Sequence, residues 1–273
     1  MARRKAAATT TTSSSKAVTN YEEKLAEIAA KEAEREQAGT GQMISIRNSK
    51  FSFQGNDLGS TLDVVVLNHA FINSYYDSLY DPDNPSPPAC FAIALDDDGM
   101  APHETSPNPQ GDEENGTCVG CWANQFGSDA RGRGKACKNN RRLAVIPGHD
   151  GWEESLAEPQ IAYLSVPPTS LAAWRGYVNK LGKGMKKPTF AFVTRMTFDE
   201  TEDYPKLQFE VLRPVDMDSI PRLIELREQT EDELLAPFSV EGYVNPEEKP
   251  ATRGKAPAKK SAPRRGKGSK FSK

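Results

Sequence analysis

One amphipathic segment divides a series of short strand-like segments into two groups, and this order limits the folds that are open to the chain. The apolar residues of the segment recur at helical spacing and are Leu171, Trp174, Val178 and Leu181. Thr169 or Ser170 can cap this helix, and Gly182 ends it. We therefore predict one helix over residues 171–181 within a chain that is otherwise rich in strands.

Strand-like patterns lie on both sides of this helix. Before it, strands are predicted at 43–55 (a bent hairpin), 62–80, 90–96, 142–146 and 161–166. After it, residues 189–198 alternate, with Phe190, Phe192, Met196 and Phe198 on one face, and residues 207–215 form the hairpin partner. One helix between a three-strand group and a two-strand group is the order of an OB-type barrel. We predict a mainly β fold with some α, an OB-type five-stranded barrel, and the same pattern leaves other small β-barrels and sandwiches open.

Charge divides the 273 residues into an acidic body and two basic ends. Of 35 Lys/Arg, four precede residue 21 and nine follow residue 250, which leaves 22 against 38 Asp/Glu in the body. We predict a disordered basic segment at 1–20, an exposed charged helix at 21–41, a binding domain at 42–216, an acidic helix at 217–245 and a disordered basic tail at 246–273. The acid-free start also resembles an organellar transit peptide. Such a partition is typical of a protein that contacts a polyanion with part of its surface.

Four cysteines carry the sharpest motif. Cys118 and Cys121 form a C-x2-C pair, and Cys137 follows sixteen residues later. Such a pair holds one ion from a tight turn, and zinc then needs two further ligands. Cys137 supplies one, and the other is Cys90 or His103; we prefer Cys90 because this choice uses every cysteine. We expect a closed, structural Zn2+ site in an insertion at about 90–142, and the alternative is a set of small core residues or a redox pair.

Two acid-free stretches stand out against the acidic body. Residues 131–142 hold six Lys/Arg, and the forty residues 159–198 hold another six. Trp122 and Phe126 lie beside the first stretch. Basic side chains neutralise phosphates and aromatic faces stack on bases of any identity, so these stretches favour a groove for single-stranded nucleic acid. The alternative interpretation of the first stretch is a solvated positive loop.

No motif of an enzyme is present in the sequence. The P-loop, the dinucleotide-binding glycines, the nucleophile elbow and the zinc-protease helix are all absent. The run Asp96–Asp98 leaves open a metal-dependent nuclease that uses Mg2+, and we expect no enzymatic activity. No apolar run approaches the roughly 18 residues of a membrane helix, so we expect no membrane contact and an intracellular, reducing setting.

Several longer motifs point to a known family. They are PPACFAI at 87–93, C-x2-C-W-x-N-x-F-G-S from Cys118, G-K-A-C-K-x-x-R-R-L from Gly134, S-V-P-P-T-S-x-x-x-W-x-x-Y from Ser165, and Y-P-K-L-x-F from Tyr204. Over residues 43–215 the chain resembles the single-stranded DNA-binding proteins of tailed bacteriophages. The resemblance implies an OB fold with an inserted zinc-binding element and cooperative, sequence-independent coating of single strands in phage DNA replication, recombination and repair. It places the protein in the host cytoplasm.

The resemblance also assigns site residues. It implies that Cys118, Cys121 and Cys137 are metal ligands and that the partners are single-stranded DNA, phage replication or recombination proteins, and other copies along the strand. The implied strand-binding residues are Arg141, Arg142, Lys186, Lys187 and Arg195, with Trp122 and Tyr177 as stacking candidates. The chain departs from many single-strand binders because its end is basic rather than acidic. The alternative function is a zinc-stabilised scaffold or accessory factor that contacts the replication or transcription machinery.

Overall fold

The computed structural model describes residue 24, residues 42–78 and residues 86–238. The predicted basic ends at 1–20 and 246–273 lie outside these ranges, as does the predicted helix at 21–41 apart from Lys24. None of the helices in the described ranges is both long and apolar enough to span a lipid bilayer.

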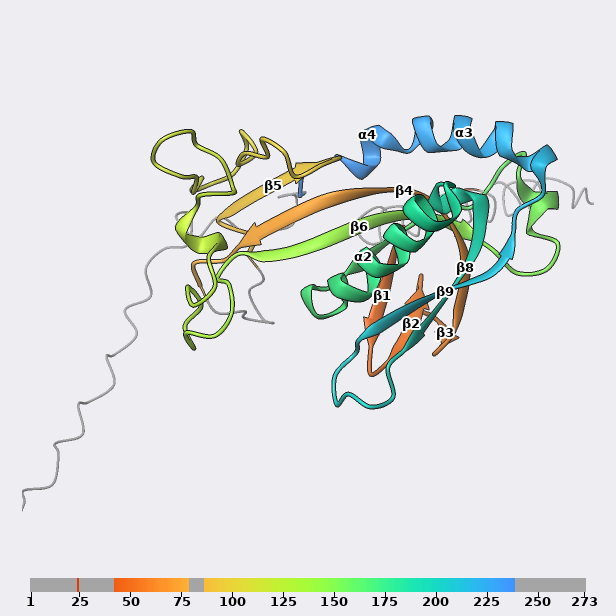
Figure 1. The fold of residues 1–273 in the computed structure, drawn as a ribbon, viewed down its shortest axis with the longest axis horizontal. Helices are drawn as coiled ribbons and strands as arrows, with labels where there is room; N and C mark the ends of the chain where they lie inside the picture. The colour runs from red at the N-terminus through yellow and green to blue at the C-terminus, as the bar shows by residue number, and fades with distance from the viewer. Residues whose placement is uncertain (1–23, 25–41, 79–85, 239–273) are drawn as a thin grey trace, which may run out of the picture.

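The described chain is mainly β and forms one curled, mixed sheet with few helices (Figure 1). Along the sheet the order is β3-β2-β1-β7-β6-β4-β8-β9, and β5 pairs with β4 outside this path. The strands are β1 Met43–Arg47, β2 Lys50–Phe53, β3 Asn56–Gly59, β4 Leu62–Tyr75, β5 Cys90–Ala94, β6 Lys138–Pro147, β7 Ala162–Val166, β8 Phe192–Phe198 and β9 Leu207–Pro214. The pairing of β1 with β7 is parallel, and the other pairings are antiparallel.

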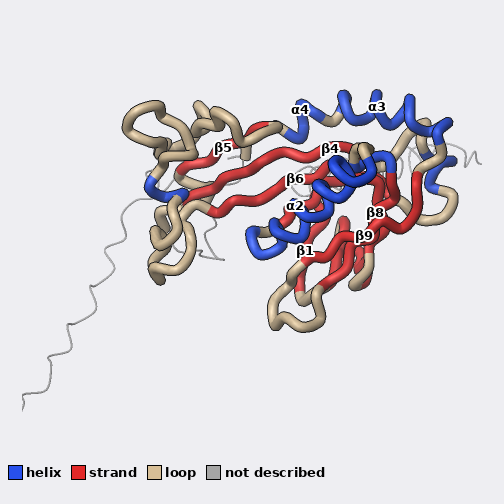
Figure 2. Tube along the Cα trace, in the orientation of Figure 1, coloured by secondary structure: helices blue, strands red, loops and turns tan. Residues whose placement is uncertain are grey.

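The long strand β4 organises the sheet. One of its edges pairs with β8 at residues 62–65 and with β5 at residues 71–75, and its other edge pairs with β6. Figure 2 shows β4 and β6 running side by side from the helices to the loops between β5 and β6. The same two strands therefore support both the core of the domain and the cysteine-rich insertion.

Helices cover both faces of this sheet. Helix α2 Leu171–Asn179, continued by a π-helical turn Lys180–Met185, packs Trp174 and Leu181 against Val64 and Val66 of β4. Helices α3 Ile220–Gln229 and α4 Glu231–Leu234 pack against the opposite face of β4. Because successive side chains of a strand alternate in direction, one strand contributes to both cores.

The predicted strands and the predicted helix are present, but several bounds differ. Strand β3 was not predicted, β4 ends at Tyr75, and β6 begins at Lys138. The helix does not end at Gly182, because its π-helical turn continues to Met185.

The segment 189–198 begins as a 3-10 turn, so Phe190 joins the core under α3 while Phe192 and Met196 join the core under α2. The acidic C-terminal helix is divided into a 3-10 turn, α3 and α4, and helical structure ends at Leu234. Residues 239–245 of that predicted segment lie outside the described ranges.

Candidate functional site

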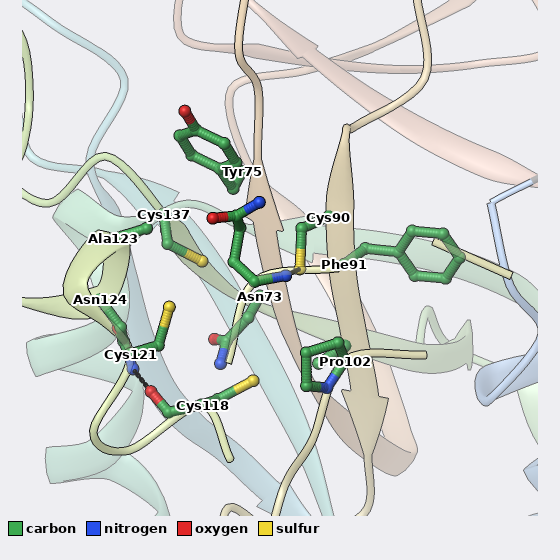
Figure 3. A pocket seen from close by; sticks show the side chains of 12 residues that line it. Asn73, Tyr75, Cys90, Phe91, Pro102, Cys118, Cys121, Ala123, Asn124 and Cys137 are labelled. Atoms are coloured by element: carbon green, nitrogen blue, oxygen red, sulfur yellow. Dashed lines mark hydrogen bonds between the residues drawn. The ribbon is translucent and has the colours of Figure 1, made fainter. Parts of the chain in front are cut away.

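The four cysteines line one small cavity. All four are buried and none forms a disulfide. Figure 3 shows their sulfur atoms around a common space, which measures about 10 Å³ and is close to the size of one water molecule. Cys90 is the first residue of β5, and Cys137 directly precedes β6. Cys118 and Cys121 lie in the loop before the 3-10 turn Trp122–Asn124.

Backbone contacts hold the cysteine loops in place. The Cys118 N–H donates to the Met100 carbonyl at 2.7 Å, and the Cys137 N–H donates to the Ala123 carbonyl at 2.8 Å. Gly120 lies against the side chain of Asp112, where an added Cβ would come within 2.7 Å of the Asp112 Cβ. The glycine between the two cysteines is therefore required by this close approach.

The thiols of Cys118 and Cys137 are protonated at neutral pH in the absence of a metal. Burial raises the pKa of Cys118 to about 11 and that of Cys137 to about 12, and the neighbouring thiols add to both shifts. In the described part of the chain, no three His, Cys, Asp or Glu side chains are arranged as a metal site. The four cysteines nevertheless line one cavity, and thiolates are ligands that soft ions such as zinc prefer.

His103 lies outside this cavity. Its ring stacks on Phe91 at 5.1 Å between centroids, and its Nδ1 is hydrogen-bonded to the Thr105 hydroxyl at 2.8 Å. Cys90 lines the cavity, and its sulfur accepts a hydrogen bond from the Gln110 N–H at 3.1 Å. Of the two alternatives for the fourth ligand, the structure places Cys90 with the other thiols.

Two adjoining hollows lie beside the cysteine insertion, and we call them together the groove. Their volumes are about 230 and 320 Å³, far larger than the thiol cavity. Both are lined by Phe71 of β4, Arg141 of β6, Leu171 and Arg175 of α2, and Asp97 of the loop after β5. The second hollow also includes Cys118, Asn139 and Lys135, so the insertion forms part of the groove.

Strand pairing places an arginine on an aromatic ring in the groove. Phe71 and Arg141 are direct partners in the β4–β6 register, as are Asn73 and Asn139. The guanidinium carbon of Arg141 lies 3.5 Å from the centre of the Phe71 ring. Burial lowers the pKa of Arg141 to about 10, with Asp97 opposing this shift and Arg175 adding to it. Arg141 therefore stays charged at neutral pH.

His69 lies in the first hollow and is neutral at pH 7. Burial lowers its pKa to about 4, and the positive charges of Arg141 and Arg227 contribute. Its ring meets Trp174 edge-on at 5.5 Å between centroids. Trp174 of the apolar core beneath α2 therefore also lines the first hollow.

The two predicted stacking residues lie away from the groove lining. Trp122 is 51% exposed, but its ring meets that of Tyr75 edge to face beside the thiol cavity, and its Nε1 donates to the Gln110 Oε1 at 3.1 Å. Tyr177 is buried in the core, where its hydroxyl is 2.6 Å from that of Thr194. In this structure the ring of Tyr177 is not exposed to a ligand.

Four of the five predicted basic contacts are engaged or placed elsewhere. Arg142 points to the face opposite Arg141 and donates to the Leu234 and Ala236 carbonyls at the end of α4. Arg195 forms a two-pronged ion pair with Asp63, with both distances 2.8 Å. Lys186 and Lys187 are exposed after the π-helical turn and line neither hollow. Only Arg141 among the predicted strand contacts lies in the groove.

Sequence reasoning did not identify the remaining groove residues. Arg175 and Lys135 belong to the two acid-free stretches, and this position could have indicated that they line the groove. Phe71 belongs to an alternating strand, but its partner Arg141 lies seventy residues later. In the Asp96–Asp98 run, the Asp96 carboxylate accepts a hydrogen bond from the Asp98 N–H at 3.2 Å, and Asp97 alone lines the groove.

Comparison of the chain with protein families, with characterised proteins and with solved structures gave no significant match.

Proposed function

We propose that the protein binds single-stranded DNA in the groove and has no enzymatic activity. The observation that supports this best is the lining of the groove, where Arg141 stacks on Phe71 and Arg175 and Lys135 add positive charge. Proteins that bind single strands without sequence preference combine such a basic groove with flat surfaces on which bases stack. Guanidinium planes serve as stacking surfaces as well as aromatic rings.

The proposal includes an OB-type barrel made of β4, β6, β7, β8 and β9. Helix α2 follows the third of these strands, as in the predicted order. The pairing of β4 with both β6 and β8 supports the assignment, since it curls the sheet toward a barrel. OB folds bind oligonucleotides on the face of their second and third strands, and β6, the second strand here, carries Arg141.

We include a structural zinc ion among the proposed features. The ion would be held by the thiolates of Cys90, Cys118, Cys121 and Cys137 and would supply folding energy to the insertion. Cys118 lines both the thiol cavity and the groove. Metal binding by these residues would therefore also fix part of the groove.

The wider role follows from the resemblance to phage proteins. It is coating of single strands in phage DNA replication, recombination and repair, in the host cytoplasm, with contacts to replication or recombination proteins and between copies along the strand. A second candidate is a zinc-stabilised scaffold or accessory factor. Val119 and Phe126 of the insertion favour it, since they are 67% and 82% exposed and offer an apolar surface for a protein partner.

The direct test is a titration of a fluorescent dT oligonucleotide and of a matched duplex at two salt concentrations, with zinc measured on the same sample. The proposal expects tight, salt-sensitive binding that favours the single strand, with one zinc per chain. Equal affinity for the duplex would indicate that the basic ends of the chain, rather than the groove, bind the DNA. Absence of binding in a zinc-loaded sample would favour the scaffold.

A further inference from the structure

One carboxylate lies in the otherwise basic groove. Among the described residues that line the two hollows, Asp97 is the only acid, and it lines both of them together with Arg141 and Arg175. It lies in the loop after β5 and its residue is exposed. A negative charge here opposes the binding of phosphates, so its presence in the groove needs another explanation.

The Asp97 carboxylate forms no hydrogen bond or ion pair with another described residue, although its charge favours the charged form of Arg141. By contrast, the carboxylate of Asp96 accepts a hydrogen bond within the same loop. Asp97 is therefore the acceptor of this loop that faces the groove without a protein donor.

The surface next to Asp97 suits a nucleobase. The guanidinium carbon of Arg141 lies 3.5 Å from the centre of the Phe71 ring, and both residues line the two hollows. A base that stacks on a guanidinium plane presents its edge to the surrounding side chains. Asp97 is one of those side chains. A carboxylate accepts hydrogen bonds from base N–H groups and is repelled by base carbonyls.

We propose that Asp97 reads the edge of one nucleobase in the groove and gives the protein a preference for bases with amino donors over thymine. Guanine offers two adjacent donors, its ring N–H and its amino group, and cytosine and adenine each offer one amino group. Thymine presents a single N–H between two carbonyl oxygens. The expected order at this position is guanine first and thymine last. This inference rests on the proposed single-strand binding.

The expected preference is modest because Asp97 is exposed. A good bidentate contact to a base discriminates by about 1–3 kcal/mol, and the lower end corresponds to about a fivefold change in affinity. The test compares a dT oligonucleotide of about nine nucleotides with the same oligonucleotide carrying one central dG. Each is titrated into the full chain, into Asp97→Ala and into Asp98→Ala, a matched loss of charge in the same loop that leaves the groove lining intact.

The outcomes separate the inference from the proposed function. We expect the dG oligonucleotide to bind about fivefold more tightly to the unmodified chain and to Asp98→Ala, and equally with dT to Asp97→Ala. Equal affinity of the unmodified chain for both oligonucleotides would overturn the inference and leave single-strand binding intact. The same follows if Asp97→Ala strengthens binding of both oligonucleotides and keeps the preference. No binding of either oligonucleotide would overturn both.

Discussion

The guanidinium of Arg141 lies on the ring of Phe71, 3.5 Å from its centre, because β6 and β4 pair these two residues directly. Arg141 is half-buried, and a cation–π contact of this kind contributes about 1 kcal/mol. It also fixes a planar cation at the junction of the two hollows. The sheet thus presents a preformed flat, positive surface, and a strand that binds there does not have to order this side chain itself.

Arg175 tests whether the groove neutralises phosphates. We expect Arg175→Gln to weaken single-strand binding to a similar extent for every base composition and to lower the slope of log affinity against log salt by about 0.7 per lost phosphate contact. Lys187→Gln is the matched control, since this residue is exposed but lies outside the lining of both hollows. A larger loss for Lys187→Gln would place the binding path on the basic segment after α2.

The fourth zinc ligand can be identified by paired substitutions. Cys90 lines the thiol cavity, whereas His103 stacks on Phe91 outside it. We expect Cys90→Ala to lower the zinc content well below one per chain and His103→Ala to leave it at one, measured by elemental analysis of purified protein. Full zinc occupancy in Cys90→Ala would contradict the assignment.

Arg142 is expected to act in folding rather than in strand binding. Its guanidinium donates to two carbonyls at the end of α4, at 3.0 and 2.8 Å. Hydrogen bonds to charged groups contribute about 1.5–3 kcal/mol, so Arg142→Met should lower the free energy of unfolding by about 2 kcal/mol. Urea denaturation measures this loss, and a parallel oligonucleotide titration should show unchanged affinity. A large loss of affinity in a folded variant would return Arg142 to the interface.

His69 should make the fold less stable in acid. Its pKa falls from 6.5 to about 4 on folding, so between these values the unfolded chain binds more protons than the folded one. Stability from this group is therefore complete above pH 6.5 and is lost as the pH falls toward 4, by up to about 3 kcal/mol. Urea denaturation at several pH values measures the effect. We expect the stability of His69→Gln to fall less on acidification than that of the unmodified chain. The replaced ring in His149→Gln is exposed, so we expect this variant to lose as much stability as the unmodified chain.

Local patterns predicted the elements of the fold better than they predicted the groove. The alternation of β8 and the apolar spacing of α2 are local properties, and both elements were predicted. Phe190 was assigned to the wrong core because a 3-10 turn interrupts the alternation before Phe192. Short-range periodicity does not report where a strand begins to the accuracy of one residue.

The groove depends on pairings between distant parts of the chain. Phe71 meets Arg141 through a strand register that no local pattern specifies, and Asp97 reaches them through the path of a loop. One feature of the sequence does bear on the groove. Arg141 and Arg142 are neighbours, and because successive side chains of a strand point to opposite faces, both could not line the same groove. The convergence of the four thiols, in contrast, follows the cysteine spacing that the sequence displays.

Binding of single strands on the Arg141–Phe71 surface is tested most directly by the affinity of a fluorescent dT oligonucleotide for Arg141→Gln and Arg195→Gln. Arg195 is the control because it also projects from the sheet but is paired with Asp63. Loss of one stacked base contact predicts an affinity about tenfold weaker for Arg141→Gln, with Arg195→Gln within about twofold of the unmodified chain. Thermal melting of both variants confirms that they are folded. An unchanged affinity in folded Arg141→Gln would contradict binding on this surface. A loss of affinity in Arg195→Gln would then place the strand elsewhere on the sheet.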